Sequence, residues 1–273
     1  MIDRIMPPAL LSLTILCGCA TPLATLPQTG AAQQSGPAYG YRPLDPLSAK
    51  LQHDVAKVPV TNCRILELFP DETVRLAIGE YDVNGNVSYG PAKAGYQGNR
   101  YRVVLDYIKS DTRSLSATTG LEPTAAAAPT GRQVPTYVGI GLRLTAEVTV
   151  QSGSVDLANL IAIGAAAQAK QVTGTLVIQA MGISGETISV PLPSEISQSS
   201  IQNTLVALGT IKSRIYDERT QISPRVIGIY DIFGGNAEAF DTFFAVLMIN
   251  PPSVWERSNS SRCPATTVDT TPK

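Results

Sequence analysis

This sequence of 273 residues is poor in histidine and tryptophan and has no excess of either charge. Lys and Arg together number 21 and Asp and Glu 22, which leaves a net charge of −1. The basic footprint of a nucleic-acid-binding protein is therefore missing, and we predict no nucleic-acid partner. Hydrophobic residues make up 44% and charged residues 16%, which is typical of a folded domain rather than a disordered chain.

Residues that commonly build catalytic and metal sites are also scarce. A Ser-His-Asp triad would depend on His53, the only histidine, which stands beside Asp54. The segment Gly182–Gly185 lacks the spacing of a nucleophile elbow. The pair Gly139 and Gly141 lacks the third glycine of a dinucleotide-binding loop, and favours close approach of a neighbouring chain instead. We therefore predict no catalytic residues, no cofactor and no metal, which leans against an enzyme without excluding one.

Acidic side chains leave two alternatives open. Oxygen-bearing residues alternate from Asp82 to Ser88, as in a calcium loop, but Lys93 stands where a closing glutamate belongs. The Asn84-Gly85 pair favours a plain hairpin turn. A glycosidase needs two facing carboxylates, and the spacing alone does not bring any two of the candidates together. The candidates are Glu80, Asp82, Asp106 and Glu147.

The N-terminus carries an apolar run from Ala9 to Leu16. That length suits the central region of a signal peptide and is shorter than the roughly 20 residues of a membrane span. The run ends in Leu16-Cys17-Gly18-Cys19, which resembles the lipobox of bacterial lipoproteins. Cys19 matches the modified position better than Cys17, because Gly18 precedes it.

The resemblance implies cleavage before Cys19 and a diacylglycerol on its sulfur, with acylation of the new amine. Two or three acyl chains anchor a protein firmly to a bilayer. Ala20 at the following position implies the outer membrane of a Gram-negative envelope, with the protein facing the periplasm or the cell surface. An ordinary cleaved secretory signal is the alternative.

Two other cysteines, Cys63 and Cys263, remain in the mature chain. In an oxidising compartment an even pair favours a disulfide, which would join the start of the domain to its tail. The alternative is two unpaired thiols.

The chain divides by composition into four parts. Residues 1–18 are the predicted signal peptide, and residues 19–48 are a tether rich in Pro, Gly, Ala and Gln. Residues 49–256 form one predicted globular domain, and residues 257–273 a polar tail. The root-mean-square end-to-end distance of such a flexible segment is about 5–6 Å times the square root of its number of residues. This gives the predicted tether a reach of roughly 30 Å.

Within the domain, hydrophobic periodicity predicts strands and helices in alternation. Strands are predicted at 73–79, 101–108, 137–150, 173–183 and 225–233. Helices are predicted at 156–170, from a capping box at Ser199 and Gln202 to about Asp217, and after an N-cap at Asn236. This order predicts an α+β or α/β domain with a mixed sheet of about five strands and about three helices.

The strand at 137–150 has the clearest pattern, with apolar residues at every second position from Val138 to Val150. The alternation predicts one dry face and one wet face. A long sheet strand covered by helices explains this pattern. It also suits half of a membrane-spanning hairpin in an oligomeric pore, although a helical pattern follows it.

Five tyrosines concentrate in one region of the chain: Tyr81, Tyr89, Tyr96, Tyr101 and Tyr107. Tyrosine suits both sheet packing and protein-contact surfaces.

We therefore expect a membrane-anchored lipoprotein that acts as a non-enzymatic structural, assembly or adaptor component. Its partners are the bilayer and an envelope protein. The alternatives are a subunit of an outer-membrane pore or secretion apparatus, and an envelope enzyme without a recognisable motif.

Anchoring is tested by fractionating cells that produce the wild type or Cys19→Ser, with mass spectrometry of the mature N-terminus. We expect acylated Cys19 in the outer-membrane fraction and loss of membrane association in the variant. Membrane association retained by Cys19→Ser would contradict anchoring at this residue.

Overall fold

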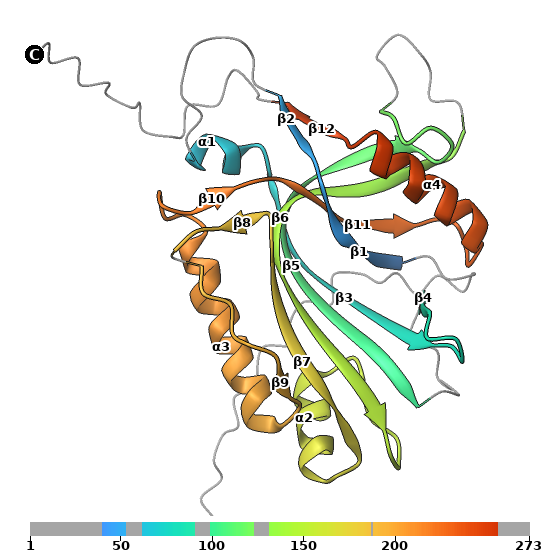
Figure 1. The fold of residues 1–273 in the computed structure, drawn as a ribbon, viewed down its shortest axis with the longest axis vertical. Coiled ribbons are helices and arrows are strands. Elements are labelled where there is room, and N and C mark those ends of the chain that lie inside the picture. The colour runs from blue at the N-terminus through green and yellow to red at the C-terminus, as the bar shows by residue number, and fades with distance from the viewer. Residues whose placement is uncertain (1–39, 53–61, 91–98, 123–130, 187, 256–273) are drawn as a thin grey trace, which may run out of the picture. The chain divides into compact units, whose positions relative to one another are not determined.

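The computed structural model describes residues 40–52, 62–90, 99–122, 131–186 and 188–255. The described residues form the following elements in chain order (Figure 1): β1 Gly40–Ser48, β2 Lys50–Gln52, α1 Asn62–Glu67, β3 Asp71–Tyr81, β4 Val87–Gly90, β5 Arg100–Ser116, β6 Gln133–Val150, α2 Leu160–Gln168, β7 Val172–Met181, β8 Ile183–Ser184, β9 Ser194–Glu195, α3 Gln198–Arg214, β10 Gln221–Ile222, β11 Arg225–Asp231, α4 Ala237–Ile249 and β12 Ser253–Trp255.

Most of these strands belong to one eight-stranded sheet with the order β1-β11-β6-β5-β3-β4. In addition, β7 pairs with β6, and β9 pairs with β7. Every strand pair in this sheet is antiparallel. Two-stranded sheets join β10 to β8 and β12 to β2, the latter in parallel.

The longest strand, β6, organises the sheet. One edge pairs with β5 along the whole of that strand. The other edge is divided, because residues 136–139 pair with β11 and residues 141–150 pair with β7. Figure 1 shows β7 and the β11–β1 pair diverging from β6 at this division.

Glycines stand where the edge of β6 changes partner. A Cβ atom at Gly139 would lie 2.1 Å from the carbonyl oxygen of Lys109, and one at Gly141 would lie 2.3 Å from that of Tyr107. No side chain fits at such distances, so glycine lets the β5 backbone approach β6 closely. This confirms the sequence interpretation of the glycine pair.

The apolar face of β6 holds the core, as its alternation predicts. Val138, Ile140, Leu142 and Leu144 are at most 1% exposed. They belong to one cluster that also includes Ile163 of α2 and other side chains from α3, α4 and the neighbouring strands. Helices α2 and α3 lie together beside β7, while α4 lies beside β11 and β12 at the other end (Figure 1).

The prediction of one wet face is wrong for the middle of β6. Arg143 is only 5% exposed, although it projects from the face opposite the helices. It is buried because β1 and β11 supply groups that contact its guanidinium. A polar residue in a period-2 pattern can therefore be buried when another strand provides partners.

Local capping residues determine where the helices begin. Asn236 caps α4 by accepting from the Ala239 amide, as predicted. The predicted capping box for α3 is wrong by two residues, because Ser197 is the N-cap and Ser200 completes the box. Ser197 suits the N-cap, but Ser200 stands where the motif usually has Glu or Gln, so the sequence pattern favoured Ser199 and Gln202 instead.

The α+β class describes this fold, but its sheet differs from the predicted one. The large sheet has eight antiparallel strands rather than about five in a mixed sheet, and the described residues form four helices rather than about three. Strands such as β9 have only two residues, too few to show a period. Strand β1 begins at Gly40, so the predicted tether is wrong over residues 40–48.

As an interior strand, β6 is flanked by β5 on one edge and by β11 and β7 on the other. The preceding β5 and the following β7 both pair with it in antiparallel orientation, and α2 stands between β6 and β7 in the chain. This agrees with the sequence interpretation of a long sheet strand covered by helices. Among the described residues, no helix is both long and apolar enough to cross a membrane.

The close approach of β5 and β6 makes Gly139 sensitive to substitution. We expect Gly139→Ala to lower the free energy of unfolding by about 3 kcal/mol, because its methyl group meets backbone atoms that cannot turn aside. Urea unfolding measures this value.

Gly209 in α3 is the matched control, since no atom lies within 4 Å of a Cβ there. We expect Gly209→Ala to raise stability by about 0.5–1 kcal/mol, through helix propensity. Equal effects of both substitutions would contradict the packing explanation.

Candidate functional site

The face of the sheet opposite α2 and α3 carries two groups of polar side chains. The pairing register of β5 and β6 places these side chains in two rows across the strands. Asp106 of β5 stands opposite Arg143 of β6, and Arg102 stands opposite Glu147. The two rows lie four residues apart on each strand and therefore on the same face.

The inner group, which we name the Arg143 cluster, comprises Tyr41, Asp106 and Arg143. Arg143 binds the Asp106 carboxylate through two atoms, with Nε–Oδ1 at 2.8 Å and Nη2–Oδ2 at 2.6 Å. Its remaining donors bind the carbonyl oxygens of Leu44 in β1, at 2.6 Å, and Ile227 in β11, at 3.0 Å. The hydroxyl of Tyr41 donates to Asp106.

Burial dominates the electrostatics of this cluster. It raises the pKa of Tyr41 well above its ordinary value, and the nearby Asp106 charge raises it further. Burial also raises the pKa of Asp106, against the hydrogen bonds from Arg143 and its positive charge. With these contacts made, the cluster is a structural joint between β1, β5, β6 and β11.

The outer group is half-exposed, and we name it the tyrosine–arginine cluster: Tyr81, Tyr89, Arg100, Arg102 and Glu147. Arg102 Nε donates to Glu147 Oε1 at 2.6 Å, and the Tyr81 hydroxyl donates to the same carboxylate. The guanidinium groups of Arg100 and Arg102 lie over the Tyr81 ring, 4.9 and 5.5 Å from its centroid.

Tyr89 reaches this group because Gly79 leaves space on β3. Gly79 pairs with Tyr89 on one side and Arg102 on the other. A Cβ at Gly79 would lie 2.2 Å from Cγ1 of Val87 and 3.1 Å from the Tyr89 ring, both on β4. The ring therefore lies against the strand, where burial raises the pKa of Tyr89 while Arg102 lowers it.

The composition and exposure of the tyrosine–arginine cluster suit binding rather than catalysis. Side chains of Arg102 and Glu147 are 37% and 30% exposed, so they are accessible without being fully solvated. Tyrosine and arginine are enriched among residues that dominate protein–protein affinity. The aromatic rings are held by charged neighbours and lose little freedom on binding.

The four carboxylates singled out as hydrolase candidates do not form one group in the structure. Asp106 and Glu147 share one sheet face, and each is held by an arginine and a tyrosine. Glu80 projects from the opposite face. Asp82 lies in the β3–β4 turn and accepts from the Asn84 and Asn86 amides, at 2.8 and 2.9 Å. This geometry confirms the Asn-Gly hairpin turn.

The predicted tyrosine concentration also divides between the faces. Tyr81 and Tyr89 join the candidate site, whereas Tyr101 is 4% exposed and belongs to the core. Tyr107 lies near α3, with the Lys212 ammonium 4.5 Å from its ring centroid. Tyr96 lies outside the described residues.

Cys63 is an exposed residue at the second position of α1. Cys17, Cys19, His53 and Cys263 lie outside the described residues. Acylation of Cys19 and the Cys63–Cys263 disulfide therefore stay predictions. No group of acidic, histidine or cysteine side chains suited to a metal occurs in the described part of the chain.

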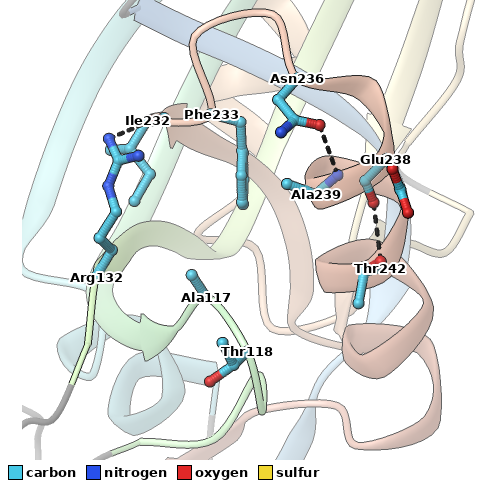
Figure 2. A pocket seen from close by; sticks show the side chains of 9 residues that line it. All are labelled: Ala117, Thr118, Arg132, Ile232, Phe233, Asn236, Glu238, Ala239 and Thr242. Carbon is cyan, nitrogen blue, oxygen red and sulfur yellow. Dashed lines mark hydrogen bonds between the residues drawn. The ribbon is translucent and has the colours of Figure 1, made fainter.

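A hollow of about 410 Å³ lies between the end of β5 and the start of α4 (Figure 2). Its polar groups serve the fold. Arg132 donates to the Ile232 carbonyl at 2.6 Å, Asn236 caps α4, and Thr242 donates to the Glu238 carbonyl at 2.8 Å. Figure 2 shows these interactions along its rim, so we place the candidate site at the tyrosine–arginine cluster instead.

Sequence reasoning named Tyr81, Tyr89 and Glu147 but missed Arg100 and Arg102. Their alternation along β5 was visible in the sequence. Their association with Glu147 depends on the register between β5 and β6, which no local pattern reveals.

Comparison with models of known protein families, with curated proteins and with solved structures found no match for this chain.

The environment of Tyr81 can be measured through its titration. Burial, followed by the hydrogen bond to Glu147, raises the pKa of Tyr81 from 10.0 to about 12. Because this pKa exceeds that of an unfolded tyrosine, the protonated hydroxyl stabilises the fold below pH 10. That contribution is lost as the pH rises through about 12.

We expect the ¹³Cζ resonance of Tyr81 to titrate near that value, and Glu147→Gln to lower the midpoint toward 10.0. A midpoint that is unchanged in Glu147→Gln would contradict the hydrogen bond.

Proposed function

We propose that this protein is an envelope lipoprotein, anchored to the outer membrane by acylated Cys19, that acts as a non-enzymatic adaptor or assembly component. It binds an envelope protein through the tyrosine–arginine cluster. Residues 19–39 form the proposed tether, since β1 begins at Gly40.

One observation carries the proposed binding role. Two tyrosines and two arginines share a half-exposed sheet face, and their contacts hold them in place. In this arrangement Asp106 and Glu147 are each engaged by an arginine. General acid–base chemistry needs a carboxylate that exchanges its proton with a substrate, so these two support the enzyme alternative poorly.

The pore alternative gains no support from the apolar face of β6. Its residues contact helix and strand side chains in the core cluster, so lipid contact there would require the helices to leave. We therefore advance the adaptor role alone.

Site-specific photocrosslinking in cells tests the binding role. p-Benzoylphenylalanine is placed at Tyr89 in the full chain, and in a matched control at Val206, a residue of α3 that is 70% exposed. We expect Tyr89 to crosslink to one discrete envelope protein, identified by mass spectrometry, and Val206 not to do so.

Absence of a crosslink at Tyr89, or the same product from both positions, would contradict a binding role for this face. The Cys19→Ser variant shows in addition whether the partner is reached only from the membrane.

A further inference from the structure

We propose that the tyrosine–arginine cluster binds an acidic, carboxylate-bearing segment of the partner protein, with Arg100 as the principal cation. This inference rests on the proposed function and specifies the chemistry of the partner.

The charges of the cluster do not cancel. Glu147 is its only carboxylate and is bound by Arg102. Arg100 contacts the ring of Tyr81, and it is absent from the ion pairs found among the described residues. One positive charge is therefore left over on an exposed side chain, and an anionic group is its natural complement.

Asp82 follows Tyr81, the ring that Arg100 contacts, but its carboxylate is engaged within the β3–β4 turn. It accepts from the amides of Asn84 and Asn86 and from the Asn86 side chain, at 3.1 Å for the last. These bonds lower the pKa of Asp82 and hold its charge within the turn.

Arg102 offers a second point of contact. Its side chain is 37% exposed, although Nε is engaged by Glu147. The hydrogen bond to Glu147 and its charge raise the pKa of Arg102 against the effect of burial, so the guanidinium stays charged. An incoming carboxylate therefore meets two guanidinium groups that share the Tyr81 ring.

The tyrosines favour a protein segment over other anions. A membrane surface or a nucleic acid is bound by many basic residues acting together. Here the cation of Arg100 lies over the Tyr81 ring, and Tyr89 lies beside Arg102. The two rings supply apolar contact area for side chains of a partner. The positive charge of Arg100 then favours an acidic partner, and contact with the two tyrosine rings adds affinity.

Fluorescence anisotropy with a fluorescein-labelled decaglutamate peptide tests the inference on the full chain in non-ionic detergent. We expect saturable binding that weakens with added salt, and we expect Arg100→Glu to weaken it by about fivefold or more. Arg214→Glu, which makes the same charge change on an exposed residue of α3, is the control and should have less than a twofold effect. Arg100→Gln should give an intermediate loss.

The inference is overturned if the wild type does not bind decaglutamate, if Arg214→Glu weakens binding equally, or if decalysine binds as well. It is also overturned if anionic lipid vesicles bind with the same dependence on Arg100, which would identify a membrane surface. A discrete crosslink at Tyr89 together with any of these results would leave the proposed function standing and reject only the acidic partner. Circular dichroism confirms that each variant is folded.

Discussion

The bidentate contact between Arg143 and Asp106 is the interaction on which the rest of the structure depends. It is fully buried on the Asp106 side, and it lies where β6 exchanges one partner strand for another. Taking two charges out of water is costly, and the pair is tolerated because Tyr41 and the carbonyls of Leu44 and Ile227 satisfy the remaining groups. The pair makes the strand register specific, because any shift in register between β5 and β6 separates Arg143 from Asp106.

The β5–β6 register that brings Arg143 and Asp106 together also sets the geometry of the candidate site. Fixing Asp106 opposite Arg143 also fixes Arg102, four residues earlier on β5, opposite Glu147, four residues later on β6. Glycine at position 79 then admits the Tyr89 ring beside that pair. The inner row is buried and rigid, while the outer row is half-exposed and available to a partner. One sheet register thus serves both stability and the proposed recognition of a protein.

Sequence patterns predicted local features well and long-range partners poorly. The alternation in 137–150 identified β6 and its buried face, and Asn236 identified the start of α4. The burial of Arg143 was missed because β1, which helps to cover it, lies in a segment whose composition resembles a tether. Arg102 and Glu147 are 45 residues apart, so only the pairing of β5 with β6 brings them together.

Hydrogen exchange by mass spectrometry on Arg143→Lys tests the central role of this joint most directly. Lysine keeps the charge but loses the planar fork that reaches Asp106 and two carbonyls at once. We expect faster exchange of the amides of β1 and β11, with α2 and α3 exchanging as in the wild type. Wild-type exchange rates in β1 and β11 of this variant would contradict the central role of the Arg143–Asp106 contact.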